Sequence, residues 1–410
     1  MNEDQKNIKK EVNRQLEIIL RNVEEVIPVE ELQKKLEKSI AENKPLRVKI
    51  GIDPTSPFVH IGHMVPYKKL REFQDLGHVA VLIIGDYTAR IGDPTGRNSE
   101  RPPLTPEDVK ENAKNYTEQI FKVVREDKAE VHYQSEWFND FDLYKVIKLA
   151  SYFSVAQMLT HETFKKRLEE GNRLSLHEIL YPLLQAYDSV AINADVELGG
   201  TDQKFNILCG RDLMREMNME PQVAVLLPLL MGTNGVKMSK SLGNTIPILS
   251  SPKEKFGKVM SISDDLIINY MKYASNMSYQ EIKNYEELLS KNAINPRDVK
   301  IAIAKSIIEL YHSKEDALRE EEEFIKVFSK RELPTEMVEF KINEPKKLTE
   351  ILKELNFAQS LSEAKRLISQ GGVSINGEKI TDIDYVMNLK KGEEKVIKSG
   401  KKNFAKIIGN

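Results

Sequence analysis

Two histidines around a glycine form the first group of residues whose types and spacing suit chemistry. His60 and His63 lie three residues apart around Gly62 in the stretch PTSPFVHIGH. Gly62 has no Cβ, so a bulky group can approach the backbone there, and the imidazoles can donate hydrogen bonds to phosphate oxygens. Neither a carboxylate nor a cysteine lies at ligand spacing from them, so the pattern favours a phosphate site over a metal site. A lone histidine would more often be structural.

Two lysines in the stretch KMSKS, residues 237–241, form the second group. Lys237 and Lys240 lie three residues apart, just after the glycine-containing stretch GTNG. This arrangement suits a mobile cationic clamp over a polyphosphate. A solvated surface loop is the commoner role of such a pair, so the lysines alone do not establish a clamp.

The elements around the histidines have the order strand, helix, strand. Residues 46–53 (LRVKIGID) and 79–86 (VAVLIIGD) are typical of buried strands, and residues 63–77 have helical periodicity. This spacing is typical of a βαβ unit, which predicts a parallel sheet with right-handed crossovers. In open parallel sheets, ligands bind at the carboxyl ends of the strands, which is where His60 and His63 fall.

The rest of the chain divides into regions of different pattern. The first 45 or so residues have helical amphipathic periodicity, and a helix at 204–218 followed by a strand at 222–230 extends the α/β pattern. The pattern is helical from about 251 to 330, and the last 65 residues are mixed. We therefore expect an α/β fold with a doubly wound parallel sheet, then a helical domain and a small α+β domain. The predicted ranges are 1–248, 249–330, a linker at 331–345, and 346–410.

Composition is that of a globular protein with two or three domains. The chain has 410 residues, of which 40% are apolar and 30% charged. No apolar run approaches the roughly 18 to 20 residues of a membrane span, and the N-terminus lacks the apolar core of a secretory signal. The single cysteine, Cys209, agrees with a reducing compartment, so we expect a cytoplasmic protein. One cysteine and seven histidines leave little material for a structural metal site.

Charge is distributed unevenly along the chain. The formal net charge is -2, yet residues 346–410 contain 13 Lys and Arg against 8 Asp and Glu. A basic tail on an acidic body favours a polyanionic partner for the tail. From charge alone, a solvated lysine-rich end is an equally good interpretation.

The stretches HIGH and KMSKS together resemble the two signatures of class I aminoacyl-tRNA synthetases. The segments GIDPT, IGDPTGRNSER and LYPLLQAYDSVAINADVELGGTDQKFN are similar to the tyrosyl-tRNA synthetases of that class. The resemblance covers nearly the whole chain, and the first 30 residues are the least diagnostic. It implies a Rossmann-like catalytic domain and an enzyme that activates L-tyrosine with ATP to tyrosyl-adenylate. The tyrosyl group then passes to the 3′ end of tRNA(Tyr) for translation.

The resemblance also implies roles for individual residues. Because the substrate carboxylate is itself the nucleophile, catalysis would depend on positioning and on donors and charges near the phosphates. The residues implied in catalysis are His60, His63, Lys237, Lys240 and Thr55. Those implied in ATP binding are Gly51, Asp53, Gly62, Gly200, Asp202, Met238, Ser239 and Lys240. Those implied in tyrosine binding are Asp93, Tyr181, Gln185, Asp188 and Gln203.

Magnesium is expected to arrive with the ATP, and neither a tightly bound cofactor nor a metal site made by the protein is expected. The resemblance further implies a homodimer. No membrane partner is expected.

Three of the tyrosine-binding candidates share one predicted helix. Tyr181, Gln185 and Asp188 are spaced by four and three residues, so a helix would turn them to one side. Pro182 complicates this, because a helix is expected to begin or kink at proline. Without the resemblance, the polar rim of an amphipathic helix would be the commoner interpretation.

One position departs from the pattern of many bacterial relatives. In the family, Asp188 would accept a hydrogen bond from the phenolic hydroxyl of the substrate, and a tyrosine four residues before the aspartate of DPT would contact the same hydroxyl. This chain has Lys49 at that position, as does a second bacterial subgroup, which also has the KMSKS spelling. The sequence alone does not show what replaces the missing contact.

The C-terminal segment, about 346–406, resembles an S4-type RNA-binding domain, notably in SLSEAKRLISQGGVSINGEKI. Such a domain would present Lys365, Arg366 and Lys379 to an RNA backbone, in agreement with the basic tail. The helical region before it occupies the place of the anticodon-recognising domain of the family. The partner implied is tRNA(Tyr).

Three alternatives are consistent with parts of the sequence. A nucleotidylyltransferase of the same superfold would need neither the basic tail nor the helical middle region. A non-catalytic RNA-binding or splicing-assistance protein would not need both signatures intact. A tryptophanyl-tRNA synthetase, the nearest enzyme of another specificity, lacks the S4-like domain and the arrangement of Gln185 and Asp188.

Overall fold

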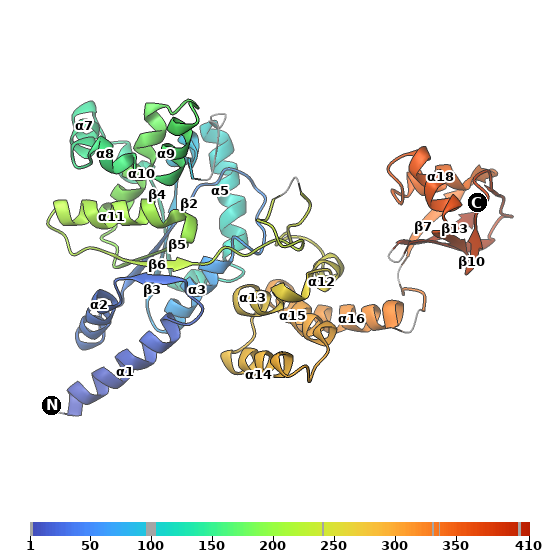
Figure 1. Ribbon diagram of the computed structural model, residues 1–410, viewed down its shortest axis with the longest axis horizontal. Coiled ribbons are helices and arrows are strands. Elements are labelled where there is room, and N and C mark those ends of the chain that lie inside the picture. The colour runs from blue at the N-terminus through green and yellow to red at the C-terminus, as the bar shows by residue number, and fades with distance from the viewer. Residues whose placement is uncertain (1–2, 96–103, 240–241, 330–331, 336, 401–402) are drawn as a thin grey trace. The chain divides into compact units, whose positions relative to one another are not determined.

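The structure is a computed structural model that describes residues 3–95, 104–239, 242–329, 332–335, 337–400 and 403–410 (Figure 1). The chain forms two compact units, Met1–Ala317 and Leu318–Asn410, and each is described by itself.

A six-stranded sheet forms the centre of the first unit. The strand order is β1-β6-β5-β2-β3-β4, and all neighbours are parallel except β1, which is antiparallel to β6. The strands are β1 Glu25–Ile27, β2 Arg47–Ile52, β3 Val79–Ile84, β4 Ala129–Tyr133, β5 Val196–Gly200 and β6 Val223–Leu227. The predicted doubly wound parallel sheet is confirmed, and strands β1, β4 and β5 are added to those expected from the sequence.

Helices cover both faces of this sheet. The chain passes from β2 to β3 and β4 in one direction, then returns to β5 and β6 on the other side of β2, so right-handed crossovers place their helices on opposite faces. The larger helices are α1 Glu3–Ile19, α2 Val29–Glu42, α3 Val65–Asp75, α5 Pro106–Ile120, α10 Leu176–Ala191 and α11 Lys204–Glu216. The shorter ones are α4 Thr88–Ile91, α6 Ser135–Phe138, α7 Leu143–Ser151, α8 Val155–Met158 and α9 Glu162–Glu169.

Local sequence explains where several helices begin and end. At the start of α10, the Ser175 side chain and the N3 residue Glu178 form a capping box, and Thr105 and Asp108 do the same for α5. After α3, Gly77 adopts a φ of 98°, a left-handed conformation that favours glycine and ends the helix. The predicted βαβ unit made by β2, α3 and β3 is confirmed by the parallel pairing of its strands.

A helical region follows the sheet within the first unit. Its helices are α12 Pro252–Met260, α13 Ile267–Asn269, α14 Tyr279–Ser290, α15 Pro296–Tyr311 and α16 Lys314–Phe324, the last of which runs across the boundary of the unit. Buried apolar side chains such as Val259, Ile303 and Ile307 form its core. The predicted helical character is confirmed, since the described residues between 251 and 329 contain no strand.

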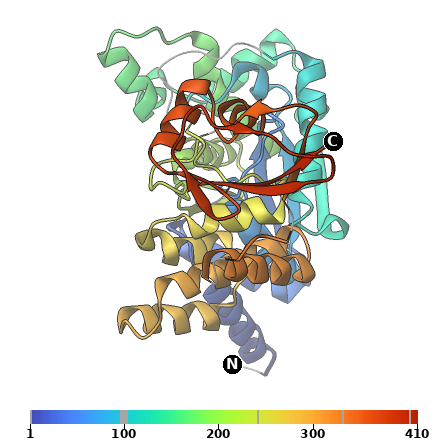
Figure 2. The same cartoon turned by 90° about the vertical axis from the view of Figure 1, so that its right-hand side faces the viewer.

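The second unit has a five-stranded sheet in the order β10-β9-β12-β13-β7, with two helices packed against it (Figure 2). Its helices are α17 Leu348–Glu354 and α18 Leu361–Ser369, and its strands are β7 Val338–Ile342, β8 Lys346–Lys347, β9 Val373–Ile375, β10 Glu378–Ile380, β11 Val386–Met387, β12 Glu394–Ser399 and β13 Asn403–Gly409. Strand β7 lies within 331–345, where a linker was predicted, and pairs in parallel with β13.

The hairpin predicted in the second unit is present. Strands β9 and β10 are antiparallel and are joined by Asn376 and Gly377, which have φ values of 49° and 91°. Positive φ at both positions is the requirement of a tight two-residue hairpin turn, and Asn-Gly is the sequence that meets it most readily. A core of Leu348, Ile351 and Ile397, among others, joins the helices to the sheet.

Candidate active site

A cavity of about 840 Å³ opens at the carboxyl ends of the parallel strands of the first unit. Its wall contains Asp53 after β2, Gly85 after β3, Gln134 after β4 and Gly200 at the end of β5. The chain reverses direction across the sheet between β2 and β5, and such a switch point is where ligands bind in open α/β sheets. The position of the cavity therefore follows from the topology.

The cavity brings together almost every site residue proposed from the sequence. The described candidates that line it are Gly51, Asp53, Thr55, His60, Gly62, His63, Asp93, Tyr181, Gln185, Asp188, Gly200, Asp202, Gln203, Lys237, Met238 and Ser239. Lys240 lies outside the described residues. The cavity has two ends, a phosphate end formed by His60, His63 and Lys237, and a tyrosine end formed by Tyr181, Gln185 and Asp188.

The HIGH segment at the phosphate end is held by backbone pairing with a distant segment. The Ile61 amide donates to the Ile246 carbonyl oxygen at 3.0 Å, and the Ile248 amide donates to the Val59 carbonyl oxygen at 3.0 Å. A Cβ on Gly62 would lie 3.0 Å from Met238 Sδ, so the KMSKS stretch packs closely against this glycine. The two stretches, about 180 residues apart in the sequence, thus form one wall.

The two imidazoles of this segment are neutral. Their rings stack with centroids 3.6 Å apart, and both side chains are half-buried. Burial lowers the pKa of His60 to about 3, and burial together with the nearby Lys237 lowers the pKa of His63 to about 4. At neutral pH they can donate hydrogen bonds without adding charge, so the positive charge of this end comes from lysine.

Lys237 is exposed, and its Nζ lies 3.5 Å from Asp202 Oδ2. The buried side chain of Asn244, which the sequence reasoning missed, supports the backbone around it. Asn244 Oδ1 accepts a hydrogen bond from the Ser239 amide at 2.8 Å, and Asn244 Nδ2 donates to Asn234 Oδ1 at 2.7 Å. This side-chain amide holds the backbone at Ser239 while the Lys237 side chain remains exposed.

Helix α10 carries the tyrosine end. Tyr181, Gln185 and Asp188 all face the cavity, as their spacing predicted. The helix runs from Leu176 to Ala191 with Pro182 inside it, so the expectation that it begins at this proline is wrong. The capping box at Ser175, six residues before Tyr181, starts the helix earlier.

Asp188 is a buried acid of the cavity wall. Its Oδ2 accepts a hydrogen bond from Gln134 Nε2 at 2.8 Å, whereas its Oδ1 has no hydrogen-bond partner among the described residues. Burial raises the pKa of Asp188 to about 7, and Lys49 and the Gln134 hydrogen bond oppose that rise. A buried acceptor without a partner is costly, so this oxygen is suited to a ligand that brings a donor.

Gln134 is a second residue that the sequence reasoning missed. Its Oε1 accepts hydrogen bonds from the Thr88 amide at 3.0 Å and from the Tyr87 amide at 3.3 Å. The amide oxygen is therefore turned towards donors, and Nε2 must face Asp188. No motif marks this glutamine, because its role depends on contacts with residues that are distant in the sequence.

The acids and amides next to Tyr181 form a connected group. Tyr181 donates from its hydroxyl to Asp53 Oδ2 at 2.8 Å, and Thr88 donates to Asp53 Oδ1 at 2.6 Å. Asp53, expected at the ATP, therefore has both oxygens engaged by residues of the tyrosine side. A Cβ on Gly85 would meet the Asp53 carboxylate, which makes Gly85 a further residue that the sequence reasoning missed.

Gln203 and Asp93 meet as expected. Gln203 Nε2 donates to Asp93 Oδ2 at 2.6 Å, and Asn206 Nδ2 donates to Gln203 Oε1 at 3.2 Å. These hydrogen bonds orient the Gln203 amide, and both partners line the cavity.

Lys49 does not line the cavity and lies buried beneath α10, in an ion pair with Glu197.

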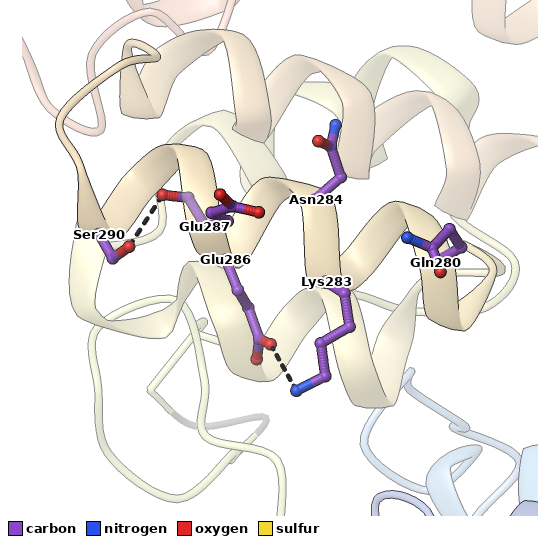
Figure 3. A pocket seen from close by; sticks show the side chains of 6 residues that line it. All are labelled: Gln280, Lys283, Asn284, Glu286, Glu287 and Ser290. Atoms are coloured by element: carbon purple, nitrogen blue, oxygen red, sulfur yellow. Dashed lines mark hydrogen bonds and ion pairs between the residues drawn. The ribbon is translucent and has the colours of Figure 1, made fainter.

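The basic candidates of the second unit do not line the cavity: Lys365 and Arg366 on α18 and Lys379 on β10 are exposed. A separate hollow of about 460 Å³ lies along α14, where Figure 3 shows Lys283 directed to Glu286. This hollow contains none of the proposed site residues.

No helix in the described part of the chain is long and apolar enough to cross a membrane.

Comparison with known proteins defines the class first. The family described as tRNA synthetases class I (W and Y) matches residues 41–329, and the chain belongs to this family. It is therefore an aminoacyl-tRNA synthetase, an enzyme, as the two signatures predicted. A second family, the Tyrosine–tRNA ligase SYY-like C-terminal domain, matches residues 327–407.

Individual relatives point to one amino acid of the two. A protein of Carboxydothermus hydrogenoformans named Tyrosine–tRNA ligase is 51% identical over 97% of this chain and 98% of its own length. One of Thermotoga maritima with the same name is 48% identical over 96% and 97%. The solved structure of a C-terminally truncated mitochondrial tyrosyl-tRNA synthetase of Aspergillus nidulans has a TM-score of 0.65 and 23% identity, covering 79% of this chain and 100% of that one, and shows the same fold.

Proposed function

We propose that the chain acts as a tyrosine–tRNA ligase and that tyrosine and ATP bind side by side in the cavity. The observation that carries the choice of tyrosine is Asp188 Oδ1, a buried acceptor in the cavity wall without a partner among the described residues. The phenolic hydroxyl of tyrosine supplies the donor that this oxygen lacks. Tryptophan would place an apolar ring edge or an indole N–H near Asp188 Oδ1, at a different distance from its amino-acid backbone.

In the first step, a carboxylate oxygen of tyrosine attacks the α-phosphorus of ATP. The new bond joins that oxygen to the phosphorus, the bond to the bridging oxygen breaks, and pyrophosphate leaves. Lys237, together with Lys240 from the sequence, supplies positive charge to the phosphates, while the neutral His60 and His63 donate hydrogen bonds. Thr55 and Gly62 lie at the same end of the cavity.

The other substrate contacts follow from the connected side chains. Tyr181, Gln185, Gln203 and Asp93 surround the position of the tyrosine ammonium group, where carboxylate and amide oxygens are suitable acceptors. Gly51, Gly200, Asp202, Met238 and Ser239 border the position of the nucleotide, with Asp53 between the two substrates. Holding both substrates in line replaces the need for a nucleophile from the protein.

Mg²⁺ is proposed to enter bound to ATP. The acids nearest the proposed position of the nucleotide are already engaged, Asp53 with Tyr181 and Thr88, Asp93 with Gln203, and Asp202 with Lys237, so phosphate oxygens and water are the suitable ligands. When bound, the ion would neutralise phosphate charge.

In the second step, the tyrosyl group passes from the adenylate to the terminal ribose of tRNA(Tyr), and AMP leaves. We assign catalysis to residues 1–248, anticodon recognition to 249–330, and RNA binding to 346–410 with β7 added to that domain. Lys365, Arg366 and Lys379 are exposed on the last, where they can contact phosphates. With these substrates, we place the protein in the cytoplasm.

A homodimer is proposed because large apolar side chains are exposed on α7, α8 and the start of α10. Leu143 is 75% exposed, Val155 72% and Leu176 81%, and Tyr144 and Ile147 are exposed near them in the sequence. Exposed apolar residues of this kind are typical of protein interfaces. Sedimentation of the chain and of the Ile147→Glu variant tests this, because a dimer should shift towards monomer in the variant.

Exchange of pyrophosphate into ATP, measured with each of the twenty amino acids in turn, tests the proposed function. Exchange should require tyrosine, and charging of tRNA(Tyr) should follow. Exchange that depends on tryptophan would overturn the proposal, and exchange without any charging of tRNA would favour a nucleotidylyltransferase.

A further inference from the structure

Lys49 lies inside the first unit, directly beneath the helix that carries the tyrosine end. It belongs to β2, and its register partner in the neighbouring parallel strand β5 is Glu197. The Lys49 side chain is 0% exposed, and its Nζ is 3.0 Å from Glu197 Oε1. Glu197 lines the cavity and Lys49 does not. Lys49 is therefore one step removed from the substrate, behind a residue that faces it.

The same ammonium group holds one turn of α10. Nζ donates to the Gln185 carbonyl oxygen at 3.1 Å and to Ser189 Oγ at 2.8 Å. Ser189 in turn donates to Glu197 Oε2, and Gln185 Nε2 donates to Glu197 Oε1, both at 3.2 Å. The ion pair thus fixes the turn from 185 to 189, which contains Asp188. Gln222 also donates a hydrogen bond to Glu197.

Lys49 on β2 is the cation among the described groups that act on the pKa of Asp188, and Glu197 on β5 and Asp53 after β2 are the acids. The Tyr181 hydroxyl of α10 and the neutral amide of Gln134 after β4 also face Asp188. Lys49 lowers the pKa of Asp188, against the larger effect of burial, whereas Glu197 and Asp53 raise it. Loss of the lysine charge favours the protonated acid, and loss of the Glu197 charge favours the carboxylate.

We propose that Lys49 is a specificity-determining positioning residue, which fixes the Asp188 turn through Glu197 and keeps Asp188 an acceptor for the hydroxyl of the substrate. Lys49 thus takes the place of a second direct contact, because it controls the one group that touches the hydroxyl. The inference rests on the proposed function, since that function assigns the hydroxyl to Asp188.

The test is the pH dependence of kcat/KM in pyrophosphate exchange, measured with tyrosine and with phenylalanine from pH 6 to 8.5. The variants are Lys49→Met, Glu197→Gln and the double variant. With tyrosine, the rise of kcat/KM with pH should move up by about one pH unit in Lys49→Met and down by a similar amount in Glu197→Gln. The double variant, which loses one charge of each sign, should return towards the parent profile.

With phenylalanine, which has no hydroxyl, kcat/KM should not rise with pH in any variant. Profiles that keep their midpoints, or that move the same way in both single variants, would show that Lys49 is only structural. If Lys49→Met does not fold, Glu197→Gln still tests the inference. A purely structural role of the ion pair would not move the pH midpoint of kcat/KM for tyrosine down in that variant. A parent enzyme that exchanges with tyrosine while the midpoints stay fixed rejects the inference alone, and a parent without tyrosine exchange rejects the proposed function.

Discussion

The phosphate end and the tyrosine end of the cavity differ in what holds their side chains. At the phosphate end, Lys237 is exposed, and the contacts that hold the surrounding segments involve backbone groups. These are the Ile61–Ile246 backbone pairing and the hydrogen bond from the Ser239 amide to the Asn244 side chain. At the tyrosine end, Asp188, Gln134 and Glu197 are buried and hydrogen-bonded side chain to side chain. On the proposed function, selection of the amino acid depends on buried side chains of the sheet and α10, whereas the charges that act on phosphate lie on exposed chain.

This difference predicts which kinetic constant each end controls. A preformed buried site discriminates between substrates, because a wrong substrate leaves its polar groups unpaired. Exposed charges near the phosphates act when charge builds up in the transition state.

Removal of the hydroxyl acceptor should have the largest effect. Asp188→Asn keeps the shape of the side chain but loses the charge, so the preference for tyrosine over phenylalanine in adenylate formation should fall by several orders of magnitude. Sites built to bind a substrate hydroxyl reject the analogue without it by about 10⁴- to 10⁵-fold, and tyrosyl-tRNA synthetase is itself the standard example. A ratio of kcat/KM values that changes less than tenfold would contradict the assignment.

At the phosphate end, Lys237→Ala should lower kcat for adenylate formation about 100- to 1,000-fold, by analogy with the loss of one donor to a developing charge. The KM for tyrosine should change little, because the lysine acts on the leaving pyrophosphate. Rapid-quench measurement of adenylate formation separates the two constants. An unchanged kcat with a raised tyrosine KM would place Lys237 in substrate binding instead.

Gln134→Met tests whether the tyrosine end depends on its supporting hydrogen bonds. Loss of one bond to a charged group costs about 1.5 to 3 kcal/mol, which is about 10- to 100-fold in the tyrosine-to-phenylalanine ratio. Tyr87→Phe is a control, because that side chain bonds to Asn139 rather than to the acids of the cavity. Equal losses in both variants would mean a general disturbance of the fold.

Charges on the second unit should leave both ends of the cavity unchanged. The triple variant Lys365→Glu, Arg366→Glu and Lys379→Glu should raise the KM for tRNA about 10-fold or more at physiological salt, because phosphate contacts dominate affinity. Pyrophosphate exchange should stay at the parental rate. The matched control is Lys353→Glu, an exposed lysine on α17. If the control is as impaired as the triple variant, the three residues have no special role.

The smallest effect concerns stability against pH. The pKa of His63 is lowered to about 4 by burial, so below its ordinary value of about 6.5 the unfolded chain binds a proton that the folded chain does not. Stability should therefore fall as pH decreases from 6.5 towards 4. Between pH 7 and 5.5, the free energy of unfolding of His63→Asn should fall by about 1 kcal/mol less than that of the parent, as measured by urea unfolding. The raised pKa of Asp188 acts in the opposite direction over the same range, and both proteins retain it.

The sequence predicted those parts of the site that depend on local pattern. The spacing of Tyr181, Gln185 and Asp188 placed all three on one side of a helix, and the order of strands placed the histidines at the carboxyl edge of the sheet. Gln134 and Asn244 were missed because their roles depend on partners 54 and 5 residues away, in geometry that no short motif specifies.

Lys49 shows the limit most clearly. Its position in the sequence suggested a missing contact, but its function depends on which residue of β5 lies beside it, and only the strand register answers that. Pro182 misled for a different reason: a capping box at Ser175 outweighs the loss of one backbone hydrogen bond, so the helix continues through the proline.

The pairing of Val59 and Ile61 with residues 246 and 248 has a consequence for how the enzyme is made. During synthesis the chain emerges from its N-terminus, so the HIGH segment leaves the ribosome long before the segment that holds it. A nascent chain that ends after β6 has all the described strands of the central sheet and the HIGH segment, but lacks residues 246 and 248, which pair with that segment. The order of synthesis therefore delays completion of the site until the residues just beyond KMSKS have been added, and such late contacts between distant segments are slow to form.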